Sequence, residues 1–224
     1  MRINKYIAQA SSLSRRKADE AIAAGRVQIN GQSAEQGQEI GDTDTVTLDG
    51  RAITPPVKTI TIMLNKPVGY VVSRNGQGSP TIYELLPAEY QNLQPVGRLD
   101  KDSSGLLLLT NDGDLANELT HPSHQKLKIY QVTLDKPLTP DDKTRIEQGI
   151  ELEDGPSKLE IKTLENRKSV IENCHLYEVK MSEGRNRQIR RTFAALGYKV
   201  QTLHRTHFGD HQLGTLQSGK IKEI

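Results

Sequence analysis

The sequence predicts an α+β protein with two domains. The first is a small αα-β domain over residues 1–56. The second spans residues 59–224 and is built on a mixed, largely antiparallel sheet flanked by helices. Three observations support this. Residues 1–53 combine two helical patterns with two short strands, Thr54-Pro55-Pro56 is typical of a linker, and the apolar stretches after residue 59 resemble strands joined by short turns.

The first domain begins with apolar residues at helical spacing over residues 3–10. Ser14 is a suitable N-cap for a second helix, which can end at Gly25. Residues 26–30 alternate like a strand and run into the hairpin signal Asn30-Gly31, and residues 44–50 form a second strand and turn. The pattern therefore predicts two helices followed by a short sheet.

The second helix carries positive charge where helix stability disfavours it. Its first turn is Arg15-Arg16-Lys17, and cations there oppose the helix dipole at a cost of about 0.3–1 kcal/mol each. One interpretation is a solvated charged face. The other is a phosphate site, because free N–H groups at a helix start favour anions. We favour the second, since an unfavourable position needs a compensating gain.

The larger domain contains several strand patterns in succession. Strands are expected at residues 59–64, 70–72, 106–109, 128–134 and 175–181, and helices at 114–119, capped by Asp114, and 140–150. Residues 75–78 are rich in glycine but lack the third glycine and the following helix of a dinucleotide-binding loop. We therefore expect a mobile loop there.

The most informative stretch is Gly97 to Gly113, in which Asp100 precedes a turn and a run of four leucines. The leucines predict a strand buried on both faces. An acid beside such a strand has the rigid support that catalysis requires. A structural role, with Asp100 closing the turn, is the alternative.

A basic stretch, Arg185-Asn-Arg187-Gln188-Ile-Arg190-Arg191, leads into a helix with an apolar stripe that Gly197 can end. Arg187 and Arg191 are four residues apart, a like-charge spacing that weakens a helix. A solvated face is less convincing here, because almost no acidic residue balances the arginines. Arginine also pairs bidentately with phosphate or carboxylate.

The charge of the chain is distributed unevenly. Lys and Arg total 30 and Asp and Glu total 28, so the net charge is only +2. Six basic residues nevertheless face two acidic ones within residues 1–31, which suits an anionic partner at a defined surface. The single cysteine, Cys174, excludes an internal disulfide, and the chain has no cysteine cluster for a structural zinc site. Without a signal peptide or an apolar run of about 18 residues, we expect a soluble cytoplasmic protein with no membrane partner.

These motifs together resemble known families. Residues 1–31 are similar to the small RNA-binding domain named after ribosomal protein S-four. The stretches Gly97-Arg-Leu-Asp100, Lys128-Ile-Tyr130-Gln-Val and Glu183-Gly-Arg185-Asn-Arg-Gln-Ile-Arg-Arg191 resemble the aspartate, tyrosine and basic motifs of the rRNA pseudouridine synthases of the small-subunit type. Asn65-Lys66-Pro67 also fits that family. The resemblance covers essentially the whole chain and implies that it isomerises uridine to pseudouridine in ribosomal RNA.

The resemblance also implies roles for individual residues. Asp100 would act as nucleophile or base on a flipped-out uridine, and Tyr130 would stack under the base while its hydroxyl assists the final proton removal. Arg185 would pair with Asp100, and Arg98 would open the RNA. The expected catalytic residues are Asp100, Tyr130 and Arg185. The expected RNA-binding residues are Arg98, Arg187, Gln188, Arg190, Arg191, Lys66, Arg2, Lys5, Arg15, Arg16, Lys17 and Arg26.

The isomerisation is internal, so we expect no cofactor and no metal. His204, His207 and His211 are close in sequence, but an RNA-facing or structural role fits them better than metal binding. We expect a monomer that acts on a structured stem-loop of rRNA, free or within a ribosomal assembly intermediate, with 23S favoured over 16S rRNA. The alternatives are a non-catalytic RNA-binding assembly factor, which would use the same basic surfaces, and a metal-dependent nuclease, for which the expected carboxylate cluster is missing.

Overall fold

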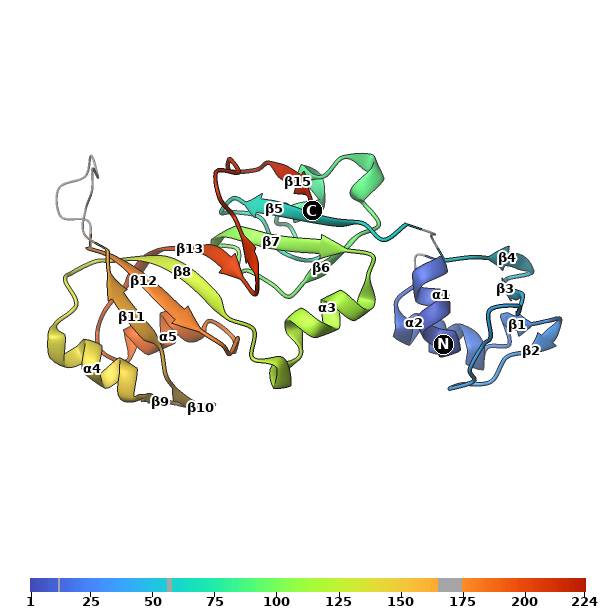
Figure 1. Cartoon of the computed structure of the whole chain (residues 1–224), viewed down its shortest axis with the longest axis horizontal. Coiled ribbons are helices and arrows are strands. Elements are labelled where there is room, and N and C mark those ends of the chain that lie inside the picture. The colour runs from blue at the N-terminus through green and yellow to red at the C-terminus, as the bar shows by residue number, and fades with distance from the viewer. Residues whose placement is uncertain (12, 56–57, 165–174) are drawn as a thin grey trace. The chain divides into compact units, whose positions relative to one another are not determined.

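The computed structural model describes residues 1–11, 13–55, 58–164 and 175–224. Pro56 of the predicted linker and Cys174 lie outside the described residues. The chain divides into two compact units, Met1–Thr59 and Ile60–Ile224, each with its own hydrophobic core (Figure 1). Within the described ranges, no helix has the length and apolar character needed to cross a lipid bilayer.

The first unit pairs two helices with a four-stranded antiparallel sheet. The helices are α1 (Ile3–Ala10) and α2 (Arg15–Ala23), and the strand order is β2-β1-β3-β4. The strands are β1 (Val27–Ile29), β2 (Gln32–Ser33), β3 (Val46–Leu48) and β4 (Arg51–Ile53). Ser14 caps α2 as predicted, since its hydroxyl accepts a hydrogen bond from the Lys17 amide at 3.3 Å. Apolar residues of α1, α2, β1 and β3 form the core.

The second unit is organised by a nine-stranded sheet whose main path is β11-β12-β8-β13-β7-β5-β15 (Figure 1). Only β13 and β7 pair in parallel among its described pairings, so the predicted α+β class with a largely antiparallel sheet is confirmed. The strands of this sheet are β5 (Thr61–Lys66), β6 (Gln94–Val96), β7 (Ser104–Thr110), β8 (Lys128–Leu134), β11 (Glu160–Thr163), β12 (His175–Met181), β13 (Val200–Phe208), β14 (His211–Gln212) and β15 (Ile221–Glu223).

Three α-helices and a hairpin complete this unit. The helices are α3 (Gly113–Thr120), α4 (Pro140–Gln148) and α5 (Gln188–Ala194). The hairpin joins β9 (Ile150–Leu152) to β10 (Gly155–Ser157). Short 3-10 turns lie at Ile82–Leu85, Ala88–Tyr90 and Pro122–His124.

Strand β7 is buried on both faces, as the leucine run predicts. Leu106, Leu107, Leu108 and Leu109 are all 0 % exposed. Leu107 and Leu109 belong to the main core, whereas Leu106 and Leu108 pack in a second cluster with Phe208. The turn before β7 is therefore attached to a strand whose side chains pack in two hydrophobic clusters.

Three local predictions were wrong: one strand, one helix cap and one helix end. No strand forms at residues 70–72, where Val71 makes only an isolated bridge to Thr81. Helix α3 is capped by Asp112 rather than Asp114, because the Asp112 carboxylate accepts the amide of Asp114 at 2.9 Å. Helix α4 ends at Gln148 rather than at residue 150, because Gly149 has a φ of +126° that a helix cannot continue.

Candidate active site

The turn that carries Asp100 is supported from below by a buried lysine. Lys66 ends β5 and is 0 % exposed, and its ammonium donates to the backbone carbonyls of Pro67 at 3.0 Å, Asp100 at 3.1 Å and Ser103 at 2.7 Å. Burial lowers the pKa of Lys66 to about 8, although the charges of Asp100 and Asp102 oppose this shift. The prediction that Lys66 contacts RNA was wrong, because this side chain holds the turn from inside the protein.

A cleft of about 730 Å³ opens above this turn. It brings together residues that are far apart in the sequence. Among the predicted site residues, its lining includes Arg98, Asp100, Tyr130, Arg185, Arg187 and Gln188. The Asp100 side chain is 35 % exposed, and its carboxylate lies 3.7 Å from Nη1 of Arg187. Tyr130 on β8 is 7 % exposed and lines the same cleft.

Asp102 links the turn that carries Asp100 to α5. Arg187, the N-cap of α5, donates from Nη1 and Nη2 to the two oxygens of Asp102 at 3.0 and 2.9 Å. Arg190 adds an Nε contact to the same carboxylate at 3.3 Å and donates from Nη2 to the Asp102 carbonyl at 2.9 Å. The Arg187 hydrogen bonds hold the pKa of Asp102 below its usual range. Arg187 and Arg190 also line a second hollow of about 580 Å³.

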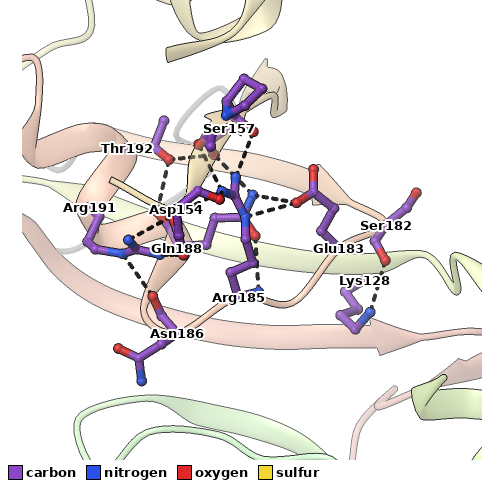
Figure 2. Close-up of polar contacts among 12 residues, drawn as sticks. Lys128, Asp154, Ser157, Ser182, Glu183, Arg185, Asn186, Gln188, Arg191 and Thr192 are labelled. Carbon is purple, nitrogen blue, oxygen red and sulfur yellow. Dashed lines mark hydrogen bonds and ion pairs between the residues drawn. The ribbon is translucent and has the colours of Figure 1, made fainter. Parts of the chain in front are cut away.

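The structure does not pair Arg185 with Asp100, so that expectation was wrong. Figure 2 shows Arg185 bound instead to the β9–β10 turn. Its Nη1 donates to the Asp154 carbonyl at 2.8 Å, the Asp154 carboxylate at 3.0 Å and the Gly155 carbonyl at 2.8 Å, while Nη2 donates to the Pro156 carbonyl at 2.7 Å. Its Nε lies 3.0 Å from Glu183. These contacts occupy the guanidinium and fix the start of the basic motif to the hairpin.

Asp154 also binds Arg191, which donates from Nη1 and Nη2 to its two carboxylate oxygens at 2.9 and 2.7 Å (Figure 2). The Arg191 hydrogen bond is the main reason why the pKa of Asp154 lies below its usual range. Gln188 is 2 % exposed, and it donates to the Ser157 hydroxyl at 3.1 Å and accepts from the Arg185 amide at 3.2 Å. The predicted RNA contacts Gln188 and Arg191 are thus bound within the protein.

Arg98 differs from these arginines. It is exposed at the cleft, two residues before Asp100, and makes no hydrogen bond or ion pair with any other described residue. A long cation close in sequence to Asp100 is thus free to bind a ligand. His204, one of the three histidines considered above, is half-buried, and its Nδ1 shares a hydrogen bond with the Ser104 hydroxyl at 2.9 Å.

The basic residues of the first unit are mostly at its surface. Arg15, Arg16 and Lys17 are exposed on the first turn of α2, and Arg2 is exposed before α1. Lys5 is half-buried, and Arg26 is paired with Asp49 through two hydrogen bonds. The first turn of α2 therefore carries the concentrated charge that the sequence predicts.

The sequence patterns did not single out four residues of the site. Asp102 and Asp154 bind its arginines, and Lys128 and Arg205 line its cleft. Lys128 could have been found, because it lies two residues before Tyr130 and side chains two apart on a strand share a face. Asp102 and Asp154 were indistinguishable from ordinary turn acids. Arg205 gave no signal, because its place beside Tyr130 depends on the pairing of β13 with β8.

Comparison with known proteins gives matches over both units of the chain. Residues 60–195 match the family model described as RNA pseudouridylate synthase, and residues 1–46 match the S4 domain. An uncharacterized RNA pseudouridine synthase of Aquifex aeolicus is 37 % identical over 231 residues, covering 100 % of this chain and 90 % of the relative. Ribosomal large subunit pseudouridine synthase B of Bacillus subtilis is 35 % identical, covering 100 % of this chain and 91 % of the relative.

A solved structure is similar over the same length. A crystal structure of a pseudouridylate synthase superposes with a TM-score of 0.70 at 33 % identity, and the match covers 100 % of this chain and 96 % of that chain.

Proposed function

Because the chain belongs to the RNA pseudouridylate synthase family and carries an S4 domain ahead of its synthase domain, we propose that it isomerises a specific uridine of 23S rRNA to pseudouridine. The large-subunit name of the Bacillus subtilis relative supports 23S over 16S rRNA. The protein acts as a monomer in the cytoplasm, on free rRNA or on an assembly intermediate. The observation that carries the proposal is the half-exposed carboxylate of Asp100, held in one cleft with Tyr130 and the unpaired Arg98.

Asp100 acts on the target uridine as nucleophile or base while the glycosidic bond breaks and re-forms to a ring carbon. Either role requires a carboxylate that can reach the uridine, and the Asp100 carboxylate is 35 % exposed, with Nη1 of Arg187 at 3.7 Å. The carbonyls of Asp100 and Ser103 are bound by Lys66, so the turn does not have to order itself when the substrate arrives. Catalysis therefore relies on a fixed backbone and a side chain with few contacts.

The target base must leave its helix to reach Asp100. Tyr130 provides an aromatic surface for the extruded base, and its hydroxyl assists removal of the last proton. Arg98 occupies the space that the base leaves in the RNA. Its lack of a partner within the described chain supports this role, because opening RNA requires a cation that can move out of the cleft.

Arg187 and Arg190 contribute to RNA binding around the second hollow, next to the exposed Lys199. The role of Arg185 follows from its contacts: it positions the Glu183–Arg187 segment at the edge of the cleft and does not touch Asp100. Arg191 supports the same turn through Asp154.

The first turn of α2 binds RNA phosphate. Replacing Arg15, Arg16 and Lys17 together by Gln should weaken binding and lower the slope of log K against log [salt] by up to about 3. The measurement is RNA affinity between low and physiological salt, with Arg26→Gln as control, because Arg26 is already paired with Asp49. An unchanged slope in the triple variant would show that this turn does not touch RNA.

Tritium release from rRNA labelled at uridine C5 tests the catalytic proposal. Asp100→Asn should bind unmodified rRNA like the wild type and release no tritium, whereas Asp141→Asn on the exposed start of α4 should be fully active. Retained release by Asp100→Asn would refute the assignment. A wild-type protein that binds rRNA without releasing tritium would instead be the RNA-binding assembly factor considered above. Mapping pseudouridines in rRNA from cells with and without the gene identifies the position and the subunit.

A further inference from the structure

The floor of the cleft holds a buried arginine whose charge is not balanced nearby. Arg205 on β13 is 2 % exposed, and it donates from Nε to the Leu106 carbonyl at 2.8 Å. Its Nη2 is buried and has no hydrogen-bond partner in the described part of the chain. A buried guanidinium with an unused donor and no carboxylate partner among the described residues is costly.

A second cation lies close to it. Lys128 is half-buried on β8, and its ammonium donates to the Ser182 carbonyl at 3.2 Å (Figure 2). Its one other hydrogen bond within the described residues goes to the Lys126 carbonyl at 3.1 Å. Burial lowers the pKa of Lys128, and the positive charge of Arg205 lowers it further. Within the described ranges neither cation forms an ion pair with a carboxylate, so their mutual repulsion is not offset by a salt bridge.

Strand pairing places both cations beside Tyr130. Arg205 lies opposite Tyr130 in the register of β13 and β8, and Phe208 lies opposite Lys128. Residues opposite each other in an antiparallel pair share a face of the sheet. The Phe208 ring is 4.8 Å from the Arg205 guanidinium and 5.4 Å from the Lys128 ammonium, and all of these residues line the cleft that contains Asp100.

We propose that Lys128 and Arg205 form an anion subsite that binds a backbone phosphate of the extruded nucleotide whose base stacks on Tyr130. This inference rests on the proposed function and adds a binding site to it. A carbonyl of the base would satisfy a donor but leave both charges unbalanced, whereas a phosphate diester supplies a full negative charge and two acceptor oxygens. The subsite thus links recognition of the RNA backbone to the position of the reacting base.

The chain provides a matched control two residues away. Lys126 lines the same cleft, but its ammonium lies 2.7 Å from the carboxylate of Glu118. Lys126 is therefore already neutralised, and the subsite model assigns it no phosphate. Lys128→Met and Lys126→Met remove the same charge from neighbouring positions, and only the first should remove a phosphate contact.

Affinity for unmodified rRNA is measured first, with all variants in an Asp100→Asn background so that turnover does not interfere. Lys128→Met should weaken binding roughly tenfold, the effect of one charge-assisted hydrogen bond, and reduce the salt slope by about 1. Lys128→Arg should restore most of the affinity, and Lys126→Met should leave the slope unchanged. Arg205→Lys tests the second cation if its melting curve shows a folded protein.

Replacing the phosphates on either side of the mapped uridine by neutral methylphosphonates identifies the ligand. One replacement should weaken binding to the parent protein about tenfold and have no further effect on Lys128→Met. Equal losses in both proteins, or a slope that falls equally for Lys126→Met and Lys128→Met, would overturn the subsite. The salt slopes of Lys128→Met and Lys126→Met do not require pseudouridine formation, so a wild type inactive in tritium release would refute the proposed function while these slopes still test the subsite.

Discussion

Replacing the buried Lys66 by Met is expected to destabilise the second unit and to loosen the turn that carries Asp100. The ammonium is the donor for three backbone carbonyls, and Met leaves those carbonyls without it. Leaving a buried acceptor unsatisfied costs about 1–3 kcal/mol. Because Met also removes the cost of burying a charge, we expect a net loss of about 3 kcal/mol at neutral pH. Activity should fall further than the folded fraction does, because Asp100 loses its fixed position.

The same substitution should change how stability depends on pH. Burial lowers the pKa of Lys66 from 10.5 to about 8 in the folded protein, so the unfolded chain binds this proton more tightly. The contribution of Lys66 to the free energy of unfolding therefore rises with pH. The rise begins near the folded pKa of about 8 and ends near the unfolded pKa of 10.5. For these two pKa values, linkage increases the stability advantage of the wild type over Lys66→Met by about 2 kcal/mol as the pH rises from 7 to 9.5. The three carbonyls favour the ammonium, so this figure is an upper bound.

Urea unfolding followed by circular dichroism at a series of pH values between 7 and 9.5 measures this difference. Other groups titrate in the same range, but they cancel when the wild type is compared with the variant. Lys143→Met on α4 is the control, since Lys143 is only partly buried and, among the described residues, its one ion pair is with Glu147. A wild-type advantage over Lys66→Met that stays constant or shrinks as the pH rises would refute the reasoning.

Three further predictions test the contacts around the cleft. Asp102→Asn should cost about 1 kcal/mol at neutral pH, and urea titrations should show this cost shrinking as the pH falls through the lowered pKa of Asp102. Arg185→Ala should reduce kcat/KM about tenfold or more, and Arg191→Ala should reduce it less, because Arg185 makes more hydrogen bonds to the β9–β10 hairpin. Equal losses would mean that the arginines act only as diffuse charge. Gly105→Ala should lower the free energy of unfolding by more than about 4 kcal/mol in thermal melting. Gly105 has a φ of +106°, and a Cβ there would lie 2.2 Å from a backbone oxygen of β13. Gly113→Ala is the control and should melt like the wild type, because a Cβ at Gly113 meets open space.

Local patterns were sufficient for much of the fold. The leucine run identified β7, the Ser14 cap identified the start of α2, and alternation identified β8 and β12, because each signal lies within one element. The strand expected at residues 70–72 failed for the opposite reason. A strand forms only where a neighbour offers a ladder of hydrogen bonds, and there only a single bridge was available.

The candidate site was less predictable, since the residues that pair with one another there come from elements far apart in the sequence. The sequence placed Asp100, Tyr130 and the arginines in one site, but it could not show which arginine faces which carboxylate. That choice depends on the β9–β10 hairpin, whose Asp154 binds Arg185 and leaves Arg187 to approach Asp100. Lys66 was misassigned because a lysine beside a proline gives no indication that β15 and β7 enclose its strand on both sides.

These contacts explain how the turn can be rigid while its carboxylate stays available. Lys66 binds the carbonyl of Asp100, and Arg187 and Arg190 bind the neighbouring Asp102, so the strong interactions act on the backbone and on the adjacent side chain. The Asp100 carboxylate has only one contact to a cation among the described residues, at 3.7 Å. In the proposed mechanism, Asp102 therefore anchors the arginines, and Asp100 stays near a positive charge while its carboxylate remains available to the uridine.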